Sequence, residues 1–243
     1  EYAPDGYVVA TDVEFEVTTK KDIQKVEMID KVVEISKQDI AGEELEGATL
    51  VVTNEKTKEI VDRWVSTNEP HKVSGLKEGQ KYNLHEEVVV DGYVKASDIQ
   101  FEVTTDKETQ HIVMIDKIVT MSKVDVGGKE IEGAEIVVTD NDGNKIDSWT
   151  SDKEEHKIKG LEEGKTYILH EEVTADGYVK ATDIEFTVSY DKQNEHLEMV
   201  DKVLKVIKTD LVTGEEIEGA ELQVVDEEGN IIDEWTSTKE AHV

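Results

Sequence analysis

The sequence predicts an all-β protein built from small β-sandwich domains that repeat in tandem along a linear rod. Apolar and polar residues alternate in runs such as 99–103 and 184–188, which is typical of half-buried strands. Turn sequences such as Asn141–Asn144 and Lys77–Gly79 separate these runs. No window keeps a helical period over three turns. We therefore expect about seven short strands in each sandwich.

The same short strings recur at a nearly constant interval, so the chain is a repeat protein. The recurring aspartates lie 86 and 85 residues apart, at Asp30, Asp116 and Asp201. Lysines recur at the same intervals, at Lys37, Lys123 and Lys208. A period of this length fits a string of autonomous domains rather than a solenoid. We predict two complete repeats, 32–116 and 117–201, flanked by the back part of a repeat (1–31) and the front part of another (202–243), and we expect the chain to be an excerpt from a longer array.

The composition favours an extracellular modular protein. The 58 acidic residues outnumber the 27 basic ones and give a net charge of −31, which argues against nucleic acid and anionic membrane as partners. No stretch approaches the roughly 20 apolar residues of a membrane span. Cysteine is absent. Small secreted domains usually rely on staples such as disulfides, so these cysteine-free domains must be stabilised in another way.

Three predicted strands of each repeat present an apolar row that ends in a charged side chain. Alternate side chains of a strand share one face. By this rule the strands at 32–37, 82–86 and 112–116 end inward in Lys37, Glu86 and Asp116. The second repeat supplies Lys123, Glu171 and Asp201. One amine and two carboxyls in a common core are costly unless they neutralise one another.

We predict that this conflict is resolved covalently, by condensation of the lysine amine with the aspartate carboxyl. An apolar setting lowers the pKa of a lysine and raises those of carboxylic acids, so the neutral forms react. Glu86 and Glu171 then act as general acid and base in turn. Strand parity selects Glu86 over Glu87, and Glu171 over Glu172. The alternative is a non-covalent charge cluster, or lysines and glutamates that fray outward at strand ends.

The partial repeats lack members of the set. Asp30 has no upstream lysine or glutamate of its own repeat, and Lys208 has no following glutamate and aspartate. We expect both to stay unreacted unless further residues or a neighbouring chain complete the set.

The motifs together resemble one family, the B-type repeats of Gram-positive surface adhesins and pilins. The resemblance rests on a pattern of spaced residues at Lys37, Asp39, Leu45, Gly47, Ala48, Gly75, Leu76, Gly79, Tyr82, Leu84, Glu86, Asp91, Gly92 and Tyr93. The run 111–116 is similar to the reactive peptide of the SpyTag/SpyCatcher pair. The resemblance implies a prealbumin-like or inverse immunoglobulin-type sandwich with an intramolecular Lys–Asp isopeptide bond. Many members carry Asn where this chain has Asp, so water rather than ammonia is expected to leave.

The expected function is mechanical: a stalk of an adhesin or pilus-like fibre, outside the cell and anchored to the wall. Such repeats have each other as partners, with a host ligand bound through regions outside this chain and with end-to-end packing of chains as a further contact. The rival interpretation is that the repeats themselves bind a host protein or carbohydrate. A transthyretin-like enzyme has no catalytic constellation here, so the only chemistry expected is one self-directed turnover.

No metal or cofactor is expected. The stretch Asp140–Asn144 resembles a calcium loop but lacks the final glutamate, so a hairpin turn is favoured. His85 and His170 fall on the outward face of their strands, which favours a surface role. The tryptophans recur in one strand, where packing is the default role, at Trp64, Trp149 and Trp235.

Overall fold

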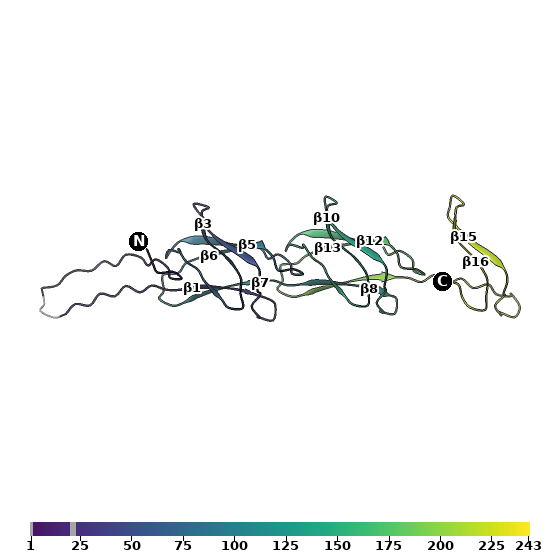
Figure 1. Ribbon diagram of the computed structural model, residues 1–243, viewed down its shortest axis with the longest axis horizontal. Helices are drawn as coiled ribbons and strands as arrows, with labels where there is room; N and C mark the ends of the chain where they lie inside the picture. Colours follow the sequence, from purple (N-terminus) through teal and green to yellow (C-terminus); the bar gives the residue numbers. More distant parts are fainter. Residues whose placement is uncertain (1, 20–22) are drawn as a thin grey trace.

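The computed structural model describes residues 2–19 and 23–243, and these residues contain strands and loops but no helix. Accordingly, they include no helix long and apolar enough to cross a membrane. Two β-sandwiches and a smaller C-terminal hairpin unit follow one another in a line (Figure 1). The predicted all-β class, with tandem small sandwiches, is confirmed.

Domain 1, the first sandwich, has seven strands in two sheets. The strands are β1 (Val33–Gln38), β2 (Thr49–Asn54), β3 (Ile60–Val65), β4 (His71–Lys72), β5 (Lys81–Val88), β6 (Ile99–Glu102) and β7 (Gln110–Ile115). One sheet has the order β4-β1-β7 and the other β3-β2-β5-β6. All neighbours are antiparallel except β1 and β7, which run side by side in the same direction.

Domain 2 repeats this topology. Its strands are β8 (Val119–Asp125), β9 (Glu135–Asp140), β10 (Lys145–Thr150), β11 (His156–Lys157), β12 (Thr166–Val173), β13 (Ile184–Thr187) and β14 (Glu195–Asp201). The sheets are β11-β8-β14 and β10-β9-β12-β13, with β8 and β14 parallel. In both domains the first strand is therefore the central strand of the three-stranded sheet, and the last strand is its parallel neighbour at the edge.

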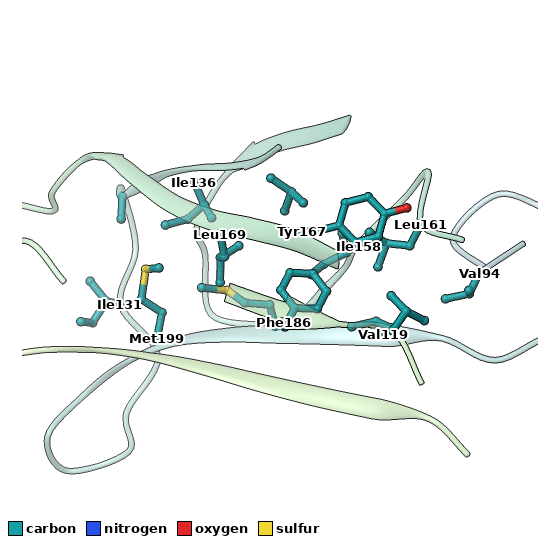
Figure 2. Packing of buried hydrophobic residues seen from close by; sticks show 14 of the residues in the cluster. Val94, Val119, Ile131, Ile136, Ile158, Leu161, Tyr167, Leu169, Phe186 and Met199 are labelled. Carbon is teal, nitrogen blue, oxygen red and sulfur yellow. The ribbon is translucent and has the colours of Figure 1, made fainter. Parts of the chain in front are cut away.

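Each sandwich has its own apolar core between the sheets, and each core also takes in a residue of the preceding repeat. Val94, from the β5–β6 loop of domain 1, is 1% exposed and belongs to the core of domain 2. Figure 2 shows it at one end of that core, beside Leu161, with Met199 at the other end. Val8 has the same place in the core of domain 1.

Backbone hydrogen bonds complete this joint between the domains. The N–H of Val94 donates to the Lys117 carbonyl at 2.9 Å, and that of Lys95 donates to the Leu161 carbonyl at 2.9 Å. The N–H of Glu163 returns a bond of 3.1 Å to the Lys95 carbonyl. The turn that starts this segment needs Gly92 at a φ of +79°, a left-handed conformation that glycine adopts without strain. The domains thus share both backbone pairing and core.

The partial repeats form fewer strands than the complete repeats. Neither 26–30 nor 203–208 is a strand, although the corresponding residues of the complete repeats, 112–116 and 118–123, lie largely in β7 and β8. Residues 10–19 and 23–30 instead run as two extended segments away from domain 1 (Figure 1). The C-terminal unit pairs only β15 (Glu221–Val225) with β16 (Ile231–Thr236). Residues 26–30 form no backbone hydrogen bond with another described residue, whereas Val206 exchanges two with His242, at 2.9 and 3.0 Å, in an isolated bridge.

We expect the two complete domains to behave in solution as one stiff rod, because the joint buries Val94 and pairs backbone with backbone. Small-angle X-ray scattering should give the pair-distance distribution of a rod. V94D places a carboxylate in the core of domain 2 and should broaden that distribution toward two hinged bodies. A hinged profile for the unmodified chain would contradict the shared joint.

Candidate cross-link site

The lysine and the aspartate of domain 1 reach the core from neighbouring parallel strands. Lys37 lies near the end of β1, in register with Met114 of β7. Asp116 is two residues beyond Met114 and therefore points to the same face. The backbone N–H of Asp116 donates to the Gln38 carbonyl at 2.8 Å, so pairing continues past the end of β7. Both side chains are directed into the sandwich by strand geometry alone.

The glutamate comes from the facing sheet. Glu86 of β5 lies opposite Leu50 of β2, but Thr49 pairs with Val88, so Glu87 is the extra residue of a β-bulge. Glu86 is fully buried, whereas the Glu87 side chain is 46% exposed and bound to Arg63 at 2.5 Å. In domain 2 the corresponding irregularity follows Glu171.

The three side chains meet in a closed site. Lys37 Nζ lies 2.9 Å from Glu86 Oε1 and donates a hydrogen bond to Asp116 Oδ1. Glu86 Oε2 accepts a hydrogen bond of 3.1 Å from the Ala96 backbone N–H. All three charged side chains are at most 1% exposed.

Domain 2 reproduces this geometry. Lys123 Nζ lies 3.0 Å from Glu171 Oε1 and donates to Asp201 Oδ1. The Ala181 N–H donates to Glu171 Oε2 at 2.6 Å. The structure thus brings together both sequence-predicted sets.

If the amine and both carboxyls were charged, the buried site would carry a net negative charge. Burial raises the pKa of Asp116 from 3.8 to about 7; the nearby Lys37 acts against this shift and Glu86 reinforces it. Glu86 Oε1 and Asp116 Oδ2 are buried and take part in no hydrogen bond with another described residue. A proton on one carboxyl, donated to the other, would satisfy both oxygens and leave the trio neutral overall.

The corresponding atoms of domain 2 have the same features. Asp201 has its pKa raised by burial and by Glu171, with Lys123 opposing the shift. Glu171 Oε1 and Asp201 Oδ2 are again buried without a hydrogen bond among the described residues. An amine held against a carboxyl that has kept its proton is the arrangement that amide formation requires.

The remaining predicted residues lie elsewhere. Asp30 and Lys208 are exposed, and neither joins a salt bridge with another residue in 2–19 or 23–243. His85 and His170 pair at the surface with Asp98 and Asp183. Within the part of the chain that the structure describes, no group of acidic residues and histidines could hold a metal ion.

The tryptophans are partly buried and stack on histidines. Trp64 lies 4.2 Å from His71, ring centre to ring centre, and the second and third repeats have the same stack. In domain 1 the histidine Nε2 is 3.0 Å from Asp62 Oδ2. This packing covers one edge of each sandwich.

Sequence reasoning missed a second buried lysine in each domain. Lys117 follows Asp116 directly, and its Nζ donates to the Ser189 carbonyl at 2.7 Å and hydroxyl at 2.9 Å and contacts Glu195 Oε1 at 2.5 Å. Lys31 is anchored in the same way in domain 1, on Thr104 and Asp106. The recurrence of Lys directly after the aspartate was the available signal.

It also missed a buried glutamate at each joint. Glu163 Oε2 accepts a bond of 3.0 Å from the Ser97 N–H, and Lys192 lies 2.5 Å from its other oxygen. At the upstream joint Glu78 Oε2 accepts a bond of 3.0 Å from the Thr11 N–H, and Lys107 Nζ lies 2.7 Å from Oε1. Each glutamate ties the preceding repeat to its own domain.

The comparisons with known proteins agree with this architecture. Residues 31–118 and 117–203 each match the SpaA family, described as a prealbumin-like fold domain. These matches cover most of the chain, and the chain belongs to this family. No curated protein matches it.

Several solved structures are similar over much of the chain. The shaft pilin SpaA of Lactobacillus rhamnosus GG is 13% identical, with a TM-score of 0.36, over 73% of this chain and 99% of that one. A streptococcal ancillary pilin is 18% identical, with a TM-score of 0.35, over 80% and 74%. The Bacillus anthracis TIE protein is 22% identical, with a TM-score of 0.29, over 85% and 41%. The family assignment rests on the two domain matches, not on these whole-chain likenesses.

Removing the amine should expose the cost of the two buried carboxyls. K37M leaves Glu86 and Asp116 without their cation, so the pKa of Asp116 should rise beyond its value of about 7. A raised pKa in the folded state gives stability that is complete below the unfolded value of 3.8 and is lost as the pH rises. Relative to the triple variant K37M/E86Q/D116N, which also lacks the lysine amine, we expect domain 1 of K37M to be about 3–5 kcal/mol less stable at neutral pH and to regain this difference in acid.

Thermal unfolding of K37M between acid and neutral pH measures this loss. The triple variant K37M/E86Q/D116N keeps the shapes without ionisable groups and should show a flat pH profile. Equal pH profiles for the two variants would contradict the assignment of charge to this site.

Proposed function

We propose that this chain is a stalk segment of a Gram-positive surface adhesin or pilus-like fibre, in which each complete domain forms its own Lys–Asp isopeptide bond. The observation that carries the proposal is the same closed set of amine, acid and glutamate in both domains. Family membership supports a surface fibre, and the absence of cysteine supports a staple other than a disulfide. In this proposal the stalk lies outside the cell and is anchored to the wall through regions other than this chain.

In the proposed reaction, the neutral Lys37 amine attacks the Asp116 carboxyl carbon. The new C–N bond forms as the C–OH bond breaks, and one water leaves for each amide. Glu86 takes a proton from the attacking nitrogen and returns it to the departing hydroxyl, so the protonation state of Glu86 is the same before and after the reaction. Folding holds the reacting groups together, which replaces an encounter in solution by an intramolecular step.

The placement of the bond suits a load-bearing role. Because β1 and β7 run in parallel, the chain enters at one end of domain 1 and leaves at the other. A pull along β1 reaches Lys37, crosses the amide to Asp116 and passes directly to Lys117 of the next domain. The residues between Lys37 and Asp116 then carry no load. Treated like a disulfide, closing this 79-residue separation contributes about 4–5 kcal/mol through the unfolded state.

We expect the purified chain to lack two water molecules relative to its sequence, one for each complete domain. Intact mass under denaturing conditions measures this loss, and peptide mapping should join Lys37 to Asp116 and Lys123 to Asp201. E86Q should abolish the first bond only, because an amide cannot relay the proton. The matched control E87Q alters the neighbouring exposed carboxylate and should leave both bonds. A mass equal to that of the unmodified sequence would contradict the proposal.

Force spectroscopy tests the mechanical role. In the unmodified chain, unfolding of domain 1 should release almost no hidden length, since the amide bypasses the residues it encloses. In E86Q the same event should release up to about 280 Å, at about 3.6 Å for each of the 79 residues. Equal extensions for both proteins would show that the load does not cross the bond.

A further inference from the structure

We propose that the backbone N–H of Ala96 positions Glu86 for the cross-linking step, and that domain 2 holds this N–H in place. Bond formation in one domain is then faster once the next domain has docked. This inference rests on the proposed cross-link and adds a control over when it forms.

Among the described residues, Ala96 supplies the one hydrogen bond that the structure gives to the Glu86 carboxyl group besides the contact with Lys37. The donated bond, 3.1 Å to Oε2, leaves Oε1 turned toward the Lys37 amine. Glu86 is fully buried, so no solvent replaces this donor. Without it, a buried carboxyl oxygen loses its partner, and the carboxyl is no longer held with Oε1 against the amine.

The segment that carries Ala96 is held by domain 2 on both sides. Val94 lies in the core of domain 2, and Lys95 exchanges backbone bonds with Leu161 and Glu163. The N–H of Ser97 donates to Glu163 Oε2 at 3.0 Å. Ala96 alone turns back into the core of domain 1. The donor to Glu86 is therefore placed by contacts on the next domain.

The holding site belongs to domain 2 itself. The Glu163 side chain is 2% exposed, and its second oxygen lies 2.5 Å from Lys192, so its carboxylate is fixed within its own domain. Glu78 forms an equivalent clamp with Lys107 at the upstream joint, but the repeat it holds has no Glu86 counterpart in this chain. The two clamps are chemically alike, and only that of Glu163 faces a complete cross-link site. This difference provides a matched control.

In domain 2 the Ala181 N–H donates to Glu171 in the same way and the Val179 N–H donates to the Lys202 carbonyl, but Val179 is 48% exposed and no described residue takes the place of Glu163. In an array, docking of a complete following domain would then speed the closure of each cross-link. Such an order favours covalent closure of domains that already stand in line.

The test follows bond formation in chains made by cell-free synthesis and quenched in denaturant at successive times. Peptide mapping quantifies the Lys37–Asp116 and Lys123–Asp201 bonds separately. E163A should slow the first bond by about tenfold and leave the second within about twofold, as expected for loss of one positioning hydrogen bond. E163Q keeps an acceptor for the Ser97 N–H and should restore most of the rate. E78A, the matched control, should leave both rates unchanged.

A second pair of variants guards against misfolding. V94A loosens the same segment without touching Glu163 and should also slow the first bond, whereas V8A at the upstream joint should not. Formation of the Lys123–Asp201 bond reports in each case that domain 2 has folded.

The outcomes separate the two proposals. If no bond forms in the unmodified chain, the proposed function fails. If both bonds form there but E163A and V94A leave the first rate unchanged, or E78A and V8A slow it equally, the positioning role of Ala96 is overturned.

Discussion

The fold is organised around a lysine amine enclosed by two carboxyl groups in a core that is otherwise apolar. Such a trio is tolerable only if it is neutral as a whole, which requires one carboxyl to keep its proton; the raised pKa of Asp116 reflects this requirement. The trio also dictates topology. Lys37 and Asp116 share a face only because β1 and β7 are parallel neighbours, and Glu86 reaches them only from the opposite sheet. Moving any one of these strands would leave a buried charge unmatched.

The same arrangement links the interior of a domain to its neighbour. The site lies at the end of domain 1 where the chain continues as Lys117, and Lys117 is itself buried in domain 2. The loop that supplies Val94 to the next core also supplies the Ala96 N–H to Glu86. Core packing, hydrogen bonding to the acid and domain alignment are therefore properties of one short segment, and none of them changes independently of the others.

Strand parity located the charged trio because the period of a strand is strict, and a charge at the end of an apolar row is conspicuous. It separated Glu86 from Glu87 even though a bulge follows, since the bulge begins after Glu86. The joint was not predictable in this way: Val94 and Glu163 lie in loops without a period, and their partners belong to another repeat. Residues 26–30 correspond to 112–116 of the next repeat but form no strand, because apolar alternation marks a strand only where a neighbouring strand is present.

The contacts at the joints before and after domain 1 are alike, and this has a genetic consequence. Val8 and Val94 enter the next core, Glu78 and Glu163 clamp the incoming loop, and Lys31 and Lys117 anchor the connection. Complete repeats with these residues can therefore follow one another. Unequal recombination between the repeated gene segments would add or delete whole units while regenerating an identical joint each time. The length of an array of these domains is then free to vary over generations without any compensating substitution at the junctions.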